Sequence, residues 1–368
     1  MSIATLISST QLTPRETLMQ VEKRLRSLWE PKPGEKAQAR VCTANLVFVT
    51  TDETIAERYQ SVIDEVIVNM PSRAILLVFT AIPMRDPLVA DVSAVCGVGE
   101  NAPCSERVTI ICASEMKRHA ASIAESLRLS ELPSTLIWLG KISASDPLFE
   151  SLSANVERVI IDSEYSSIES AIELIGWSDT TGGDTAVSDL AWTRMAPWQE
   201  LTARMFDDPK LEPFVRCIRS VEIWQAGTGD ALGAEPVFFL SWLATTLGWT
   251  RNHENFSAPD GSLIQLRIER KPEAPAIAPL ALLRIVLTAE LDGVVLRGIV
   301  EHDEADGTWA PDRLRWSLEV DLPSATNQVV PLGANKAARI LERTLRRSPL
   351  DPAFIQAARF ARSLVRQN

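Results

Sequence analysis

Apolar and polar residues follow two different spacings in the first half of the chain. Short runs rich in Val, Ile, Leu and Phe, typical of buried strands, occur at 41–50, 74–80, 89–96, 108–113, 135–139 and 159–162. Segments with apolar residues every three or four positions predict helices at 53–69, 115–129, 147–152 and 167–176. One more helix is expected to begin at a capping box formed by Thr13 and Glu16 and to stop at residues 31–34. Strands that alternate with helices predict an N-terminal α/β sandwich-like domain with a mostly parallel sheet covered on both faces.

The second half has strands that follow one another without helices between them. At 264–269 and 313–320 apolar and polar residues alternate, which is typical of strands with one wet face. Asp292 and Gly293 separate two apolar runs and predict a two-residue hairpin turn with positive φ at both positions. Helices are expected at 236–247 and from 332 onward. This half therefore predicts an α+β domain with an antiparallel sheet and C-terminal helices.

Length and composition add a domain count and a broad class. A chain of 368 residues that is 46% apolar and 23% charged is too long for one ordinary domain. The polar break at 179–184 places the expected domains at 1–178 and 184–368. The sequence contains no apolar run of the length needed to span a bilayer and does not begin like a secretory signal, so we expect a cytoplasmic protein with no membrane partner.

The net charge of -11 argues against nucleic acid as a general partner, because the field of the protein repels phosphates. One segment differs, since residues 336–366 carry an excess of positive charge. A solvated helix face is the simplest explanation of this basic segment. Docking onto an acidic partner and RNA binding are the alternatives.

No catalytic, cofactor-binding or metal-binding set of residues stands out. Residues 97–102 fit a permissive glycine fingerprint, but Pro103 and the next strand leave no room for the helix that a dinucleotide site needs, so we expect a turn between two strands. The histidines His119, His253 and His302 lie in unrelated contexts. The segment 302–307 lacks the oxygen spacing of a calcium loop and is better explained as a solvated hairpin turn. Cysteines eight residues apart do not match the spacing of a structural zinc site. We therefore expect no catalytic residues, cofactor or metal.

Two tryptophans stand directly after the polar break, in the segment 188–208. Trp192 and Trp198 belong to an apolar stripe with helical spacing, whereas Arg194 lies off that stripe. Pro197 is expected to kink this helix or to begin a second one. A stripe packed into the core of the protein is the more common outcome, and a partner-binding wedge is the alternative.

The sequence of this segment resembles the signature of the OpcA family of glucose-6-phosphate dehydrogenase assembly proteins. The resemblance rests on D-L-A-W-T-R, P-W-Q-E-L and M-F-D, and on strands and helices that follow the order of the family along nearly the whole chain. The family usually has Arg after the second Trp, where this chain has Gln199, so an ion pair at that position does not carry over. The resemblance implies a non-catalytic partner, an assembly factor and allosteric activator, of glucose-6-phosphate dehydrogenase. Such a protein supports NADPH production in the oxidative pentose phosphate pathway.

The resemblance gives the Trp segment a candidate function. Trp192, Arg194 and Trp198 are the expected partner-binding residues, because Trp and Arg dominate interface hot spots. A small-molecule-binding or catalytic α/β protein acting on a nucleotide or sugar phosphate is the alternative function. Some relatives are thought to respond to thioredoxin, which would make Cys96 and Cys104 a redox pair. Five cysteines, an odd number, argue against a disulfide framework, and two unrelated thiols are the preferred interpretation.

Overall fold

The computed structural model describes most of the chain, in twelve segments: 5–11, 18–30, 40–84, 86–98, 102–164, 166–181, 184–229, 231–272, 277–305, 308–320, 326–332 and 337–365. The predicted capping box at Thr13 and Glu16 and the predicted helix stop at 31–34 lie outside these segments. Contacts group the chain into two units. The first comprises Met1–Ser166, Gly176–Leu190 and Ala337–Leu350, and the second comprises Ser167–Ile175, Ala191–Lys336 and Asp351–Asn368. The limits 1–178 and 184–368 for independently folding domains stay a prediction.

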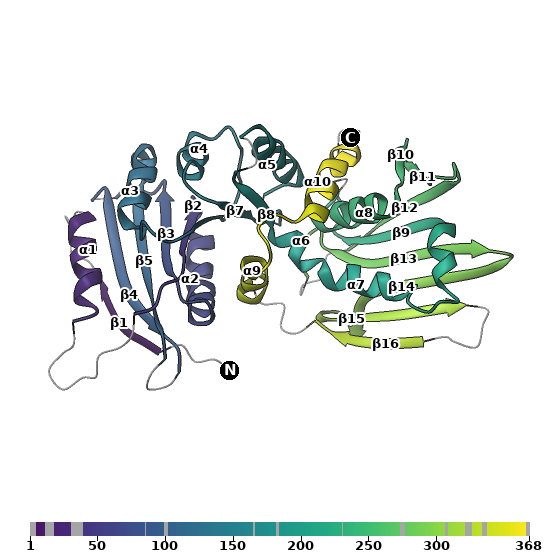
Figure 1. The fold of residues 1–368 in the computed structure, drawn as a ribbon, viewed down its shortest axis with the longest axis horizontal. Helices are drawn as coiled ribbons and strands as arrows, with labels where there is room; N and C mark the ends of the chain where they lie inside the picture. The colour runs from purple at the N-terminus through teal and green to yellow at the C-terminus, as the bar shows by residue number, and fades with distance from the viewer. Residues whose placement is uncertain are drawn as a thin grey trace. The chain divides into compact units, whose positions relative to one another are not determined.

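An eight-stranded sheet forms the centre of the first unit (Figure 1). Its strands are β1 (Thr5–Gln11), β2 (Asn45–Thr50), β3 (Arg73–Thr80), β4 (Leu88–Cys96), β5 (Cys104–Ala113), β6 (Ser134–Trp138), β7 (Arg158–Ile161) and β8 (Ala186–Asp189). Their order across the sheet is β1-β4-β5-β3-β2-β6-β7-β8. The strands from β5 to β8 are parallel, whereas β4 and β1 are added antiparallel at one edge. The predicted mostly parallel sheet is confirmed.

Helices pack on both faces of this sheet. They are α1 (Leu18–Ser27), α2 (Glu53–Asn69), α3 (Ala120–Leu127), α4 (Pro147–Ser153), part of α5 (Ile168–Thr180) and α9 (Ala337–Arg346), with a 3-10 turn η1 (Ser114–His119). Because successive strand residues point to opposite faces, Leu46 and Phe48 of β2 pack against α2 and α9. Val47, between them, points to the other face, where it lies beside α3 and α4.

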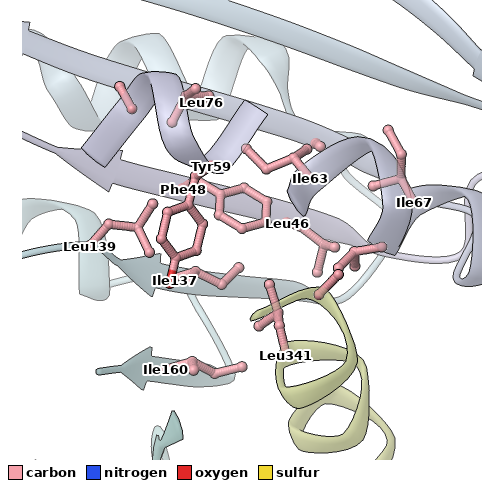
Figure 2. Packing of buried hydrophobic residues seen from close by; sticks show 14 of the residues in the cluster. Leu46, Phe48, Tyr59, Ile63, Ile67, Leu76, Ile137, Leu139, Ile160 and Leu341 are labelled. Atoms are coloured by element: carbon pink, nitrogen blue, oxygen red, sulfur yellow. The ribbon is translucent and has the colours of Figure 1, made fainter. Parts of the chain in front are cut away.

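The core of the first unit draws on a helix from the far end of the chain. Figure 2 shows Leu341 of α9 beside Ile137 and Ile160 of the sheet, with Tyr59 and Ile63 of α2 in the same cluster. All five side chains are at most 2% exposed. Residues that follow the entire second sheet therefore complete the first core.

A second eight-stranded sheet forms the centre of the second unit. Its strands are β9 (Ile218–Ala226), β10 (Thr250–Asn252), β11 (Asn255–Ser257), β12 (Leu263–Lys271), β13 (Leu282–Leu291), β14 (Val294–Ala305), β15 (Thr308–Val320) and β16 (Thr326–Pro331), in the order β10-β11-β12-β9-β13-β14-β15-β16. Among the described strands of this sheet, only β12 and β9 pair in parallel. The predicted antiparallel sheet and the predicted turn are confirmed, since φ is 51° at Asp292 and 79° at Gly293.

The helices of the second unit cover one face of its sheet. They are α6 (Leu190–Arg194, with Leu190 in the first unit), α7 (Ala196–Arg204), α8 (Ala234–Leu247) and α10 (Pro352–Val365), with a 3-10 turn η2 (Glu212–Cys217). Gly298 of β14 allows a close approach, because a Cβ there would lie 2.2 Å from the Met205 sulfur that follows α7. Val221, Ile285 and Val300 point to this helix-covered face and are fully buried. The C-terminal helices predicted from residue 332 onward are α9 and α10, one in each unit.

Candidate functional site

The Trp segment forms two short helices directly after the last strand of the first sheet. Helix α6 ends at Arg194 and α7 begins at Ala196, with Pro197 in its first turn. Proline fits a first turn because its missing N–H has no partner to lose there. The prediction that Pro197 begins a second helix is confirmed.

Trp192 is packed into an aromatic cluster of the second unit. Its ring lies 5.9 Å from that of Phe238 in α8 and 5.6 Å from that of Phe354 in α10, measured between centroids. Its indole N–H donates to a carboxylate oxygen of Asp351 at 3.0 Å. Asp351 also accepts hydrogen bonds from the backbone N–H groups of Ala353 and Phe354, so the indole is tied to the start of α10. The side chain is only 5% exposed.

Arg194 binds within the same unit. Its Nε lies 3.2 Å from an oxygen of Glu235 in the first turn of α8. The other oxygen of Glu235 accepts a hydrogen bond from the backbone N–H of Leu282 at the start of β13. One carboxylate therefore links α6 to α8 and β13.

Trp198 lies against the helix-covered face of the second sheet. Its ring makes an edge contact with the ring of His302, with centroids 5.2 Å apart, and the Trp198 residue is 4% exposed. The Nδ1 of His302 donates to the carbonyl oxygen of Ala310 at 3.1 Å. Burial lowers the pKa of His302, partly offset by the negative charge of Glu235. The edge contact between the Trp198 indole and the neutral imidazole of His302 is therefore a packing contact within the unit.

The outer surface of α7 is formed by other residues. Glu200 and Arg204 are exposed and form an ion pair at 2.6 Å, one helical turn apart. Gln199 is half-buried, and its side-chain nitrogen has no hydrogen-bond partner among the described residues. Trp192 and Trp198 are thus packed in the core of their own unit, which is the first of the two alternatives for the apolar stripe. Partner binding by Trp192, Arg194 and Trp198 stays a prediction.

The carboxyl edge of the first sheet is the second place where function could lie. Beginning at β2, the chain adds β3 and β5 on one side and then β6, β7 and β8 on the other. This is the strand order of doubly wound dinucleotide-binding sheets, which bind ligands where the order reverses, here between β2 and β6. In such sites the N-terminus of the helix after the first strand holds the pyrophosphate.

The helix at that position is already capped by the chain itself. Asp52 accepts hydrogen bonds from the backbone N–H groups of Thr54 at 2.9 Å and Ile55 at 3.2 Å, at the start of α2. The next residue, Glu53, accepts a hydrogen bond from the hydroxyl of Thr80 at the end of β3. Two carboxylates thus occupy the place where a phosphate would need free N–H groups. Asp52 was not predicted as a cap, although a short polar residue directly before a helix is the signal of a helix N-cap.

More carboxylates follow along the same edge. Asp189 at the end of β8 accepts hydrogen bonds from the hydroxyl of Ser163 and, at 3.3 Å, from its backbone N–H. Asp162 at the end of β7 accepts from the backbone N–H of Glu164 at 3.1 Å. Both aspartates are at most 2% exposed. Charge of this sign repels sugar phosphates and nucleotides.

The glycine fingerprint lies at the other end of this sheet. β4 and β5 pair antiparallel, so residues 97–103 connect two strands of a hairpin, as predicted. Residues 99–101 lie outside the described segments. The hairpin register places Cys96 directly opposite Cys104, and the two form a disulfide. The preferred interpretation of two unrelated thiols is therefore wrong, because eight residues is the spacing that this hairpin brings together. Cys42, Cys112 and Cys217 are free.

The remaining candidate features do not add a site. A pocket of about 230 Å³ lies between α3 and α4, and Arg128 in its wall is paired with Glu125. Ligand pockets usually exceed about 300 Å³ and contain polar groups that are free to bind. His302 and Asp303 lie on a β14–β15 hairpin as predicted, although both are buried. The basic segment is divided between α9 and α10, in different units. In the described segments no helix has the length and apolar character of a membrane span.

Two protein-family models match the chain. Residues 63–175 match the glucose-6-phosphate dehydrogenase subunit N-terminal domain, and residues 185–358 match the C-terminal domain of the same subunit. The chain is 28% identical over 214 residues to an OpcA protein of Synechocystis sp. and 30% identical over 192 residues to one of Nostoc punctiforme. These alignments cover 55% and 50% of this chain but only 44% and 40% of the relatives.

Similar solved structures include two oxidoreductases. Glucose-6-phosphate 1-dehydrogenase from Mycobacterium avium aligns with a TM-score of 0.49 and 10% identity, over 89% of this chain and 92% of that chain. Biliverdin reductase from Synechocystis sp. PCC 6803 aligns with a TM-score of 0.44 and 8% identity, over 88% and 98%. At these TM-scores neither likeness bears on activity. The two family models follow one another in order and together match more than half of the 368 residues, so the chain belongs to the OpcA family of glucose-6-phosphate dehydrogenase assembly proteins.

Proposed function

We propose that this protein is a non-catalytic assembly factor and allosteric activator of glucose-6-phosphate dehydrogenase. It would act in the cytoplasm and support the oxidative pentose phosphate pathway and its NADPH production. The observation that carries the proposal is the capped start of α2. Asp52 and Glu53 occupy the position at which a dinucleotide-binding sheet would hold a pyrophosphate, in a chain whose family models are described as dehydrogenase subunit domains.

An activator of this kind works by differential binding. A partner that binds the active conformation or oligomer of an enzyme more tightly than the inactive one shifts the population toward the active form. A difference of about 1.4 kcal/mol shifts that ratio tenfold. No chemistry by the activator is required.

The Trp segment remains the proposed region of contact. Since Trp192, Arg194 and Trp198 are buried or half-buried, we propose that they hold α6 and α7 in place. The exposed Glu200 and Arg204 on the outer surface of α7 would then touch the dehydrogenase. The proposed binding wedge is therefore the whole segment 188–208, with Trp192 and Trp198 packed beneath its exposed side chains.

The test is an activity measurement with the dehydrogenase of the same organism. Initial rates of NADP reduction are measured across glucose-6-phosphate concentrations, with and without an equimolar amount of this protein. We expect a higher rate or a lower apparent KM, and no turnover by this protein alone. The variant Glu200→Arg/Arg204→Glu keeps the ion pair with reversed order and should lose activation, whereas the same reversal at Glu22 and Arg26, an exposed pair with the same spacing on α1, is the matched control. An unchanged rate together with no co-elution would contradict the proposed function.

The alternative function has a direct test of its own. If the first unit bound a nucleotide or sugar phosphate, NADP or glucose 6-phosphate would raise the thermal unfolding temperature of this protein without the dehydrogenase. The carboxylates at the carboxyl edge lead us to expect no shift. A shift that grows with ligand concentration would favour the alternative.

A further inference from the structure

The face of the second sheet opposite α7 carries a continuous pattern of its own. Strand register places one row of side chains across five strands: Glu269, Trp224, Arg284, Glu301 and Arg315. A neighbouring row passes through Glu222, Val286, Ile299 and Ser317. We refer to these nine residues, with Lys271, Arg297, Asp303 and Glu319 beside them, as the open face.

Most charges of the open face are paired. The pairs include Lys271 with Glu269 at 2.6 Å, Arg284 with Glu301 at 3.3 Å, Arg297 with Glu319 at 3.2 Å, and Arg315 with Asp303 at 2.5 Å. At its margin Arg267 also pairs with Glu269 at 2.8 Å and Arg313 with Asp303 at 3.8 Å. The first four pairs carry no net charge and Glu222 adds one negative charge, whereas the protein as a whole carries -11. Two copies of the chain repel each other in general, and this face is a place where they can approach with little of that repulsion.

Trp224 lies at the centre of the open face. Two cations lie over its ring, with the Lys271 ammonium 3.8 Å and the Arg284 guanidinium 4.5 Å from the ring centroid. Its indole N–H donates to Glu222 at 2.5 Å. Val286 and Ile299 pair beside it and are only 3% and 4% exposed, so they are covered within the chain itself. A half-buried Trp held by cations is the kind of pre-ordered group that dominates interfaces.

We propose that a second copy of this chain stacks on the open face, so that two sheets pack face to face in a symmetric dimer. An interface of this kind must be complementary to itself. A two-fold axis that runs along the strands, between β13 and β14, places each residue of one strand opposite its row partner in the copy. Arg284 then faces Glu301 of the copy, and Trp224 faces Arg315. These are one ion pair and one cation–π pair, each made twice.

The geometry also suits the packing of sheets. A rotation about an axis along the strands keeps the two sets of strands aligned, which is how stacked sheets pack, about 30° from parallel. Five strands about 4.8 Å apart and about six residues long give each copy a face of roughly 24 by 20 Å. Two such faces bury about 1,000 Å², at the lower end of specific interfaces. On the other face, α7 packs against β14.

The decisive test uses two single charge reversals in the full-length chain. Arg284→Glu places two glutamates opposite each other in the dimer, and Glu301→Arg places two arginines opposite each other. Each variant alone should dimerise at least about tenfold more weakly than the parent chain in sedimentation equilibrium. An equimolar mixture of the two should dimerise again, because each reversed residue then meets its opposite charge. Circular dichroism confirms that both variants are folded.

The controls separate the open face from general charge effects. Arg204→Glu makes the same charge change on α7 and should leave the dimer unchanged. The double variant Arg284→Glu/Glu301→Arg restores both the internal pair and the facing pair, and should dimerise like the parent chain. A parent chain that is monomeric at about 100 μM, or a mixture that fails to dimerise when both variants are folded, would overturn the proposal.

The outcome is independent of the proposed function. If the single variants lose the dimer and still activate the dehydrogenase, both proposals stand. If the parent chain is monomeric and Arg284→Glu loses co-elution with the dehydrogenase, the open face binds the enzyme and the second-copy proposal is wrong. If dimerisation behaves as expected and activation is absent for the parent chain, only the proposed function fails.

Discussion

Trp198 and Trp224 are associated with opposite faces of the same sheet. Trp198 comes from α7 and packs edge-on against His302 on the helix-covered face, where it is 4% exposed. Trp224 belongs to β9 and has Lys271 and Arg284 over its ring on the open face, where it is half-buried. The first indole is surrounded by its own unit, whereas the second has cations on its ring and a side that faces solvent.

This difference separates a sequence signature from a proposed binding surface. The Trp segment is dense in motif residues, and its tryptophans are packed inside their own unit. Trp224 occurs in an ordinary alternating strand, and only the register of β12, β9 and β13 shows that charged groups surround it. A signature indicates which residues a fold requires, and the outward surface of the sheet indicates where a partner can bind.

The largest expected effect comes from removing Trp198. Trp198→Ala should lower the free energy of unfolding by about 3–5 kcal/mol, because it leaves a cavity over His302 in the helix-covered face. Urea denaturation followed by circular dichroism measures this. Trp198→Phe keeps a ring at the same position and should lose clearly less. A Trp198→Ala variant of parental stability that no longer binds the dehydrogenase would show that this indole itself makes the contact. Trp198 would then be a partner-binding residue, and the contrast with Trp224 would be wrong.

A second expected effect tests how closely α7 approaches the sheet. Gly298→Ala should lower the free energy of unfolding by about 1–3 kcal/mol, since its Cβ would meet the Met205 sulfur. Met205→Ala removes that sulfur. In a chain that carries Met205→Ala, the Gly298→Ala substitution should therefore lower the free energy of unfolding by less. A double-mutant cycle from urea denaturation gives the coupling. Additive effects would mean that the close contact between Met205 and Gly298 does not limit packing.

Much of the fold could be predicted because each half has its own periodicity. Buried runs alternating with helices indicated the parallel sheet, and polar–apolar alternation at 313–320 indicated one wet face. Strand order could not be predicted, since it depends on contacts between distant segments such as β1 with β4. The packing of α9 into the first core could not be predicted either. The amphipathic pattern of this helix, which includes Leu341, is the same whichever core it packs into.

The candidate sites were predictable in part and for similar reasons. The apolar stripe through Trp192 and Trp198 predicted burial on one side of a helix, as one of two alternatives. The disulfide between Cys96 and Cys104 required the hairpin register, which the spacing of eight residues allows but does not specify. The open face required the register of five strands at once. Residues that meet only across strands carry no local signal in the sequence.

His302 gives the helix-covered face a pH dependence near neutral pH, whereas the lowered pKa values of the carboxyl groups of Glu269 and Asp303, which accept hydrogen bonds from Lys271 and Arg315, give the open face a pH dependence in the acidic range. Burial lowers the pKa of His302 in the folded protein, so the unfolded chain binds the proton first as the pH falls. Its contribution to stability is complete above about pH 6.5 and declines below that value, until the folded pKa is reached. His302→Gln should therefore flatten the pH dependence of urea denaturation between about pH 7 and about pH 5. Equal slopes for His302→Gln and the parent chain would mean that this imidazole is not desolvated.

The smallest effect on stability is expected at Trp224, and it is the sharpest test of the comparison. Trp224→Ala removes a half-buried ring and two cation–π contacts, each worth about 0.5–1 kcal/mol at exposed sites, while Lys271 and Arg284 keep their glutamate partners. The free energy of unfolding should therefore fall by about 1–2 kcal/mol, well below the loss for Trp198→Ala. Self-association measured by sedimentation equilibrium should nevertheless weaken at least about tenfold, because the ring would no longer meet Arg315 of the copy. A loss of stability as large as that for Trp198→Ala would mean that Trp224 is packed by its own chain. The two faces would then be alike, and the open face would not be available to a partner.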